Sequence, residues 1–152
     1  MFIRQQTDQP TILIADDDPL ILRLVAVALV PEGYDVITAS NGRQALAASR
    51  AHPGPIQLLL SDVQMPEMSG PELCKEIRSE RPEIICILMS GNVSAASVGE
   101  EMRFIEKPFT TDSLRCRTRE LLQSHTWLDS GERQKLGEQV HSPDAVEQKQ
   151  SA

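Results

Sequence analysis

The sequence is poor in cysteine, and it contains neither a long apolar run nor a leader-like N-terminus. Its three cysteines form no C-x-x-C pair and have no histidine at metal-ligand spacing, so neither a disulfide framework nor a zinc site is indicated. No segment approaches the roughly 18 uninterrupted apolar residues of a membrane span. The opening "MFIRQQTDQP" lacks the apolar core of a signal peptide. We therefore expect a soluble, cytoplasmic protein with reduced thiols and no membrane partner.

Positive charge is also scarce. The chain has 15 lysines and arginines against 22 acidic residues, a formal net charge of −7. A nucleic-acid-binding surface normally shows as a basic patch or stripe. The basic run of Arg115, Arg117 and Arg119 is diluted by acidic neighbours and is interpreted as a solvated helix face. No nucleic-acid partner is expected.

The distribution of apolar residues indicates a single domain. The chain has 152 residues, of which 40% are hydrophobic, enough for one domain with a proper core. Beyond about residue 123 the sequence becomes polar and loses its periodicity. We expect an N-terminal extension over 1–10, a domain over 11–123 and a polar, largely disordered tail or linker over 124–152.

Short apolar runs alternate with helix-sized stretches along this domain. Continuously apolar runs are typical of parallel strands that are covered on both faces. Strands are expected over 11–15, 34–40, 56–61, 84–90 and 104–106, and helices over 19–30, 42–51, 71–80, 93–102 and 111–123. The partly alternating run over 34–40 is expected nearer an edge of the sheet. The pattern predicts an α/β domain with a five-stranded parallel sheet and helices on both faces.

Two helix starts carry strong local signals. Asp18 can cap the first helix, and Pro19 occupies a first-turn position where its missing N–H has no cost. Ser69 is the corresponding cap before Pro71 in the third helix. These signals place the ends of the preceding strands.

Polar side chains follow the predicted strands where each strand ends. Asp16 and Asp17 follow the first strand, Asp62 the third, Ser90 the fourth and Lys107 the fifth. In an open parallel sheet, chemistry gathers outside the carboxyl ends of the strands. With strand order 2-1-3-4-5, all five side chains converge in one pocket.

This set of side chains has a chemical logic. Three carboxylates in one pocket cannot all stay ionised cheaply without a cation, and Mg²⁺ prefers oxygen ligands of this kind. A carboxylate beside the metal can attack a phosphoryl group and form an aspartyl phosphate. The metal and a lysine ammonium then neutralise the phosphoryl oxygens, and a serine hydroxyl can hydrogen-bond another.

The stretches "ILIADDDPLIL", "LLLSDVQMPEMSG", "ILMSG" and "FIEKPF" together resemble the receiver domain of two-component response regulators. The resemblance covers roughly residues 11 to 122, and its most specific part is D-x-x-M-P-x-M-x-G at 62–70. It implies a flavodoxin-like fold and a phosphoacceptor in two-component or phosphorelay signalling. Such a domain switches a protein-interaction surface and catalyses only its own phosphorylation and dephosphorylation. A histidine kinase or histidine phosphotransfer protein is the implied donor, and the output partner is a protein.

The resemblance implies a role for each residue of the acidic site. Asp62 is the phosphoacceptor. Asp16 and Asp17 hold Mg²⁺ together with Asp62 and the backbone carbonyl of Gln64. Gln64 and Asn92 occupy the positions that tune the lifetime of the phosphorylated state.

The resemblance also implies a switch. Ser90 is the hydroxyl that follows the phosphoryl group, and Lys107 is its counter-ion. Phe104 matches the aromatic position whose side chain packs inward when Ser90 moves. Pro108 matches a cis-proline position after the lysine.

The fourth predicted helix departs from this family. Only 17 positions separate Ser90 from Lys107, several fewer than is usual. About one turn, roughly four residues, is missing from the fourth helix. Since that helix belongs to the usual output and dimerisation face of the family, a shortened fourth helix puts the usual dimer in doubt.

The first predicted helix is the second departure, because it is apolar nearly all round and Arg23 is its only charge. The side toward the sheet is expected to consist of Ile21, Leu24, Val25 and Ala28. The opposite side carries Leu22, Ala26 and Val30. We predict that these three dock the phosphodonor or, alternatively, form a homodimer, since a helix apolar all round is normally covered. Tolerated surface apolar residues are the plainer interpretation.

Two other function classes stay open at this point. Asp16-x-Asp18 resembles the paired aspartates of haloacid-dehalogenase-type phosphatases, although the cap region and the later acidic motif of that family are missing. A receiver-like scaffold that no longer switches is the other alternative, and the altered fourth helix supports it.

Overall fold

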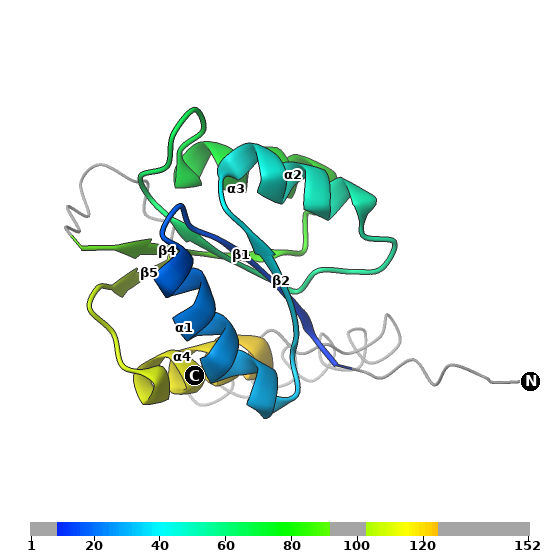
Figure 1. Cartoon of the computed structure of the whole chain (residues 1–152). Helices are drawn as coiled ribbons and strands as arrows, with labels where there is room; N and C mark the ends of the chain where they lie inside the picture. Colours follow the sequence, from blue (N-terminus) through cyan, green and yellow to red (C-terminus); the bar gives the residue numbers. More distant parts are fainter. Residues whose placement is uncertain (1–8, 92–102, 125–152) are drawn as a thin grey trace, which may run out of the picture. The chain divides into compact units, whose positions relative to one another are not determined.

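A computed structural model describes residues 9–91 and 103–124 of the chain. The strands are β1 (Thr11–Ala15), β2 (Asp35–Ala39), β3 (Leu58–Asp62), β4 (Ile85–Ser90) and β5 (Arg103–Glu106). The helices are α1 (Pro19–Leu29), a 3₁₀ turn (Val30–Glu32), α2 (Gly42–Ala51), α3 (Gly70–Glu80) and α4 (Thr111–Ser124). The strands and the helices up to Arg119 belong to one compact unit (Figure 1).

The five strands form one parallel sheet in the order β2-β1-β3-β4-β5. Side chains of β1, β3 and β4 are buried on both faces of the sheet, as their continuous apolar sequences require. β2 and β5 are the edge strands and are less buried. The predicted α/β class, strand order and edge position of the second strand are confirmed.

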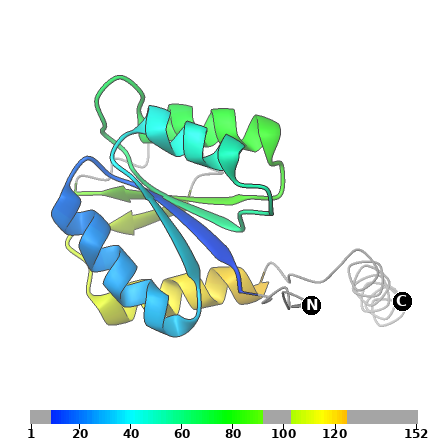
Figure 2. The same cartoon turned by 45° about the vertical axis from the view of Figure 1, so that its right-hand side comes forward.

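Helices cover both faces of the sheet. α2 and α3 pack beside one another on one face, while α1 and the part of α4 up to Arg119 lie on the other (Figures 1 and 2). Arg115 joins these last two, because its Nε donates a 2.9 Å hydrogen bond to the carbonyl oxygen of Ala28 near the end of α1. Arg119 also bonds Glu32 at 3.0 Å in the 3₁₀ turn.

The predicted caps of α1 and α3 are confirmed. The Asp18 carboxylate accepts a 2.9 Å hydrogen bond from the backbone N–H of Leu20. Asp18 stands directly before Pro19, the first residue of α1. Ser69 and Glu72 form a capping box at the start of α3, where each side chain accepts from the other's backbone N–H. Both helices therefore begin at fixed points just after β1 and the loop that follows β3.

Replacing Asp18 by alanine is expected to lower the free energy of unfolding by about 1 kcal/mol, because the N–H of Leu20 then loses its side-chain partner. Urea denaturation of the full chain measures this change. Asp18→Asn is the matched control, since asparagine caps helices equally well and should preserve most of the stability. An equal loss in both variants would contradict the capping role.

The remaining element predictions are confirmed to within one or two residues, except where they lie outside the described part of the chain. The shortened fourth helix expected over 93–102, most of the extension over 1–10 and most of the tail over 124–152 are in that category. No helix in the described ranges is long and apolar enough to cross a membrane. The cysteines are free, with Cys74 and Cys86 buried and Cys116 exposed.

The predicted orientation of α1 is partly wrong. Leu24 was expected to pack on the sheet but is 37% exposed, and the buried side consists of Val25, Ala28 and Leu29. Of the residues expected opposite, Leu22 and Ala26 are half-buried and only Val30 is exposed. The exposed large apolar residues, named the apolar stripe below, are Leu20 (72%), Leu24 (37%), Val27 (60%) and Val30 (54%). An evenly apolar helix gives no periodicity from which its rotation can be fixed.

Candidate functional site

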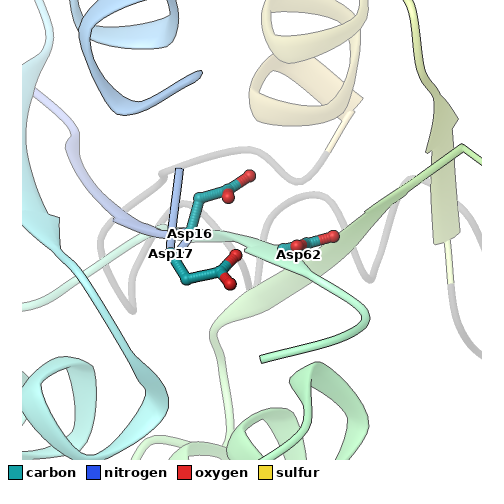
Figure 3. Close-up of side chains that lie close together, drawn as sticks. All are labelled: Asp16, Asp17 and Asp62. Atoms are coloured by element: carbon teal, nitrogen blue, oxygen red, sulfur yellow. The ribbon is translucent and has the colours of Figure 1, made fainter. Parts of the chain in front are cut away.

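Three carboxylates meet at the carboxyl ends of β1 and β3, which are neighbours in the sheet. Asp16 and Asp17 follow β1, and Asp62 is the last residue of β3 (Figure 3). One oxygen from each lies within 4.8 Å of one from each of the others. Asp16 is fully buried, Asp62 is half-buried and Asp17 is exposed. These residues are named the acidic cluster below.

Backbone bonds fix the two strand ends that carry the acidic cluster. The N–H of Asp16 donates to the carbonyl oxygen of Ala39 at 3.2 Å, which extends the pairing of β1 with β2 by one residue. The Asp16 carboxylate in turn accepts from the N–H of Asp18 at 2.9 Å. Asp62 pairs with Met89 in the register of β3 and β4. The carboxylates are thus held together by the sheet, although their charges repel.

A lysine that follows the edge strand β5 completes the site. Lys107 Nζ lies 3.0 Å from Oδ2 of Asp16 and 3.4 Å from Oδ1 of Asp62. The base of this side chain is fixed too, because the N–H of Lys107 donates to the carbonyl oxygen of Ser90 at 2.8 Å. The Lys107–Pro108 peptide bond is cis, as expected. One ammonium thus contacts two of the three carboxylates.

The charges in the site shift the acid–base equilibria of its members. Burial, followed by the charge of Asp16, raises the pKa of Asp62, and Lys107 only partly opposes this. Burial alone would lower the pKa of Lys107, but its hydrogen bond to Asp16 and the charges of both carboxylates together raise it. The site therefore carries more negative charge than one lysine neutralises, and it favours a further cation.

The loop that follows Asp62 folds back so that its last residues pack against the end of β3. The N–H of Gly70 donates to the carbonyl oxygen of Val63 at 2.9 Å. The N–H of Val63 in turn donates to the carbonyl oxygen of Met89 in β4 at 3.1 Å. A methyl group at Gly70 would overlap the carbonyl oxygen of Asp62. Only glycine therefore allows α3 to begin against the strand end that carries Asp62.

A comparison with protein families decides what this arrangement is. Residues 12–119 match the model of the response regulator receiver domain. The chain belongs to the response regulator receiver domain family. A receiver domain accepts phosphate from a histidine kinase, and it is a signalling phosphoacceptor rather than a true enzyme. The acidic cluster is typical of the Mg²⁺ site of receiver domains.

Curated relatives of this receiver domain are themselves longer proteins. The probable transcriptional regulatory protein TcrX of Mycobacterium tuberculosis is 31% identical over 95% of this chain and 64% of its own length. The probable transcriptional regulator ycf27 of Galdieria sulphuraria is 36% identical over 79% of this chain and 51% of its own. The sensor kinase CckA of Brucella abortus is 32% identical over 74% of this chain and 12% of its own length. The chain thus spans less than two thirds of the length of each of these three relatives.

Two solved structures match this chain over nearly the whole of their own length. The chemotaxis protein CheY4 of Vibrio cholerae is 29% identical with a TM-score of 0.67, covering 75% of this chain and 99% of its own. A response regulator from Thermotoga maritima is 28% identical with a TM-score of 0.67, covering 76% and 98%. The described part of residues 11–119 therefore has the fold of a receiver domain.

The other residues expected in the receiver site are only partly described. Ser90 ends β4 and is half-buried, and Gln64 is exposed in the loop after β3. Phe104 in β5 is half-buried and packs against the hydrophobic core. Asn92 lies outside the described residues. The structure thus brings Asp16, Asp62 and Lys107 into contact and leaves the switch roles of Ser90 and Phe104 as predictions.

The donor set of the acidic cluster fits Mg²⁺. All three side chains offer hard carboxylate oxygens, and the exposed Asp17 leaves room for the waters that this ion retains. No soft or nitrogen ligand is present in the cluster. With the Gln64 carbonyl as the expected fourth protein ligand, the site has the chemistry that a phosphoryl-transfer metal needs.

A groove beside Lys107 was not anticipated from the sequence. It has a volume of about 280 Å³ and is lined by Ile21, Leu24, Lys107, Pro108 and Phe109. The signal available was the apolar pair after the lysine in "EKPF", but nothing local shows that this pair faces α1. The groove places an apolar surface beside the lysine of the site.

Proposed function

We propose that this receiver domain accepts a phosphoryl group on Asp62 in an Mg²⁺-dependent reaction with a phosphohistidine. The contact of Lys107 with both Asp16 and Asp62, at the carboxyl ends of the strands, is the observation that carries this proposal. A histidine kinase or a histidine phosphotransfer protein is the donor. Phosphorylation then changes a surface that a protein output partner recognises.

The chemical step is a substitution at phosphorus. An oxygen of the Asp62 carboxylate forms the new P–O bond, the P–N bond of the phosphohistidine breaks, and the imidazole leaves with the electron pair and takes up a proton. Asp16, Asp17, Asp62 and the Gln64 carbonyl would hold Mg²⁺. Bound Mg²⁺ supplies positive charge to the phosphoryl oxygens. Lys107 is already fixed beside Asp62 and moves little to bond one of them.

The switch follows from the elements that end at the site. Ser90 at the end of β4 bonds a phosphoryl oxygen, and Phe104 on the adjacent strand β5 packs further inward in response. Since Lys107 donates its N–H to the Ser90 carbonyl, movement at Ser90 reaches β5 directly. Gln64 and Asn92 set the rate of hydrolysis by controlling access of water.

Phosphorylation of the full chain tests the function. Incubation with Mg²⁺ and acetyl phosphate should add one phosphoryl group per chain, measured by intact mass, and the label should be stable in acid and labile in base. Chelation of Mg²⁺ should prevent it. Sustained turnover of small phosphate esters without a protein label would instead indicate a phosphatase.

The face of α1 beside the groove is the proposed docking surface for the donor. Of the three residues predicted to dock the donor, Leu22, Ala26 and Val30, only Val30 is exposed, and the remaining exposed area comes from the rest of the apolar stripe. The stripe residues Leu20, Leu24 and Val27 are spaced four and three positions apart, as in the seam between two packed helices. Leu24 lines the groove together with Lys107, so a helical donor packed on the stripe lies close to the lysine of the site.

Replacing Val27 by glutamate should slow phosphotransfer from a phosphohistidine protein about tenfold, because it places a charge in the middle of the docking surface. Phosphorylation by acetyl phosphate should keep its wild-type rate, since this donor needs no docking. Ala47→Glu, on an exposed position of α2, is the matched control. Equal rates for Val27→Glu and Ala47→Glu with the protein donor would contradict the docking role. A change in solution mass in Val27→Glu alone would favour the homodimer.

A further inference from the structure

The loop between β3 and α3, residues 63–69, contains a tight turn in an uncommon backbone conformation. The N–H of Met68 donates to the carbonyl oxygen of Pro66 at 2.8 Å, and Glu67 between them has a φ of +68°. This is a γ-turn with a positive central φ, which is rare and strained. Such a conformation persists only where its surroundings impose it.

The start of α2 packs directly against this turn. Gly42 is buried beneath Met68, and a Cβ atom at residue 42 would lie 2.8 Å from Cβ of Met68 and 3.1 Å from its carbonyl oxygen. Neither of these atoms belongs to the flexible end of a side chain, so the loop itself would have to move. The start of α2 and the loop lie together in both views (Figures 1 and 2).

An ion pair adds a second contact between the same two segments. Nε of Arg43 lies 3.3 Å from Oε2 of Glu67, the residue with the positive φ. Both side chains are largely exposed, at 74% and 64%, so this pair contributes less than the packing of Gly42.

The first turn of α2 is rigid enough to hold the loop. The Asn41 side chain accepts from the N–H of Gln44 at 2.8 Å, and the Gln44 side chain accepts from the N–H of Ser40 at 3.1 Å. These two bonds fix the helix start from both sides. The two ends of the loop are bonded to each other through the Gly70 N–H and the Val63 carbonyl oxygen, and Val63 is bonded to Met89 in β4. The turn is therefore clamped between the sheet and α2.

We propose that Gly42 is a positioning residue for Mg²⁺ binding, with Arg43 in a supporting role. Gly42 lets α2 approach the β3–α3 loop closely, which holds the turn after Asp62 in the conformation that binds the ion. Neither residue touches the phosphoryl group or the metal. The inference rests on the proposed function, because it assigns the ion to the acidic cluster.

Gly42→Ala tests the proposal in the unphosphorylated full chain. Its dissociation constant for Mg²⁺, from titration of backbone amide resonances, should rise about tenfold, as for other residues that orient metal ligands. Amide exchange of Met68 and Gly70 in the metal-free protein should become faster. The free energy of unfolding in urea is measured alongside, because a methyl group that displaces the loop also strains the packing against Met68. A purely structural role for Gly42 would move stability and leave Mg²⁺ affinity unchanged.

Gly54→Ala is the matched control. Its Cβ would meet only Nε2 of His52 at 3.5 Å and Cδ2 at 4.0 Å, which are ordinary contacts, so its Mg²⁺ affinity should equal that of the wild type. Arg43→Gln, which removes only the exposed ion pair, should weaken Mg²⁺ binding about twofold.

Each outcome decides between the alternatives. Wild-type Mg²⁺ affinity and loop exchange in Gly42→Ala would overturn the proposal. If Gly42→Ala does not fold, Arg43→Gln decides, and an unchanged affinity in that variant overturns it. If the wild-type chain itself binds no Mg²⁺, the proposed function fails, and the metal-binding role of Gly42 fails with it. Loop exchange in the variants then still shows whether Gly42 holds the turn.

Discussion

Asp62→Asn is expected to abolish phosphorylation of this receiver domain by acetyl phosphate and by a phosphohistidine protein alike. An amide has no anionic oxygen to attack phosphorus, and it removes one of the three carboxylates that attract Mg²⁺. Intact mass after incubation with each donor measures the effect. A phosphoryl group still added to Asp62→Asn at full stoichiometry would place the acceptor elsewhere.

The same substitution should leave the fold intact and even stabilise it at neutral pH. Burial and the charge of Asp16 raise the pKa of Asp62, which means that the folded state disfavours its ionised form relative to the unfolded chain. A neutral amide of the same shape avoids that cost. Urea denaturation in the absence of Mg²⁺ should therefore show a free energy of unfolding at least equal to that of the wild type. Asp18→Asn, outside the acidic cluster, is the control for both measurements.

Lys107→Ala is the second substitution with a large expected effect, and its cost should depend on Mg²⁺. Without the lysine, the fully buried Asp16 loses its 3.0 Å ion pair, and the ammonium no longer offsets the repulsion between Asp16 and Asp62. Breaking a buried pair costs several kcal/mol, and we expect about 2–3 kcal/mol here because Lys107 is partly exposed.

Saturating Mg²⁺ should restore much of this loss, because the ion binds the folded state and supplies the missing positive charge. Urea denaturation with and without Mg²⁺ measures the difference. Arg50→Gln is a suitable control, since it also removes a cation from an ion pair, but from the exposed pair with Glu80 outside the acidic cluster. An equal loss of stability in Lys107→Ala with and without Mg²⁺ would show that the lysine does not share its role with the ion.

Much of the fold could be predicted from the sequence because its signals are local and strong. The continuously apolar runs of β1, β3 and β4 are hard to reconcile with anything but strands covered on both faces, and the five predicted strands alternate with helices. Asp18 with Pro19 fixes where α1 begins, so Asp16 and Asp17 must lie at the end of β1. Once the strand order is known, the acidic cluster follows from the topology alone.

The parts that could not be predicted depend on contacts between distant segments. The rotation of α1 is one, because Leu24 and Val25 are equally apolar and only the packing decides which is buried. The contact between Gly42 and Met68 is another, since a glycine at a helix start and a methionine in a loop carry no local sign of each other. The positive φ of Glu67 likewise has no signal in its residue type.

The unequal exposure of Asp16 and Asp17 has a consequence for the timing of the signal. Because Asp16 is fully buried and paired with Lys107 while Asp17 is exposed, the described residues leave the acidic cluster open to solvent on the side of Asp17, next to the start of α1. Under the proposed function, we expect the donor histidine and the water that later hydrolyses the aspartyl phosphate to approach from this side. A donor that stays docked on α1 would then shield the phosphoryl group from water, so the decay of the signal would begin when the donor leaves.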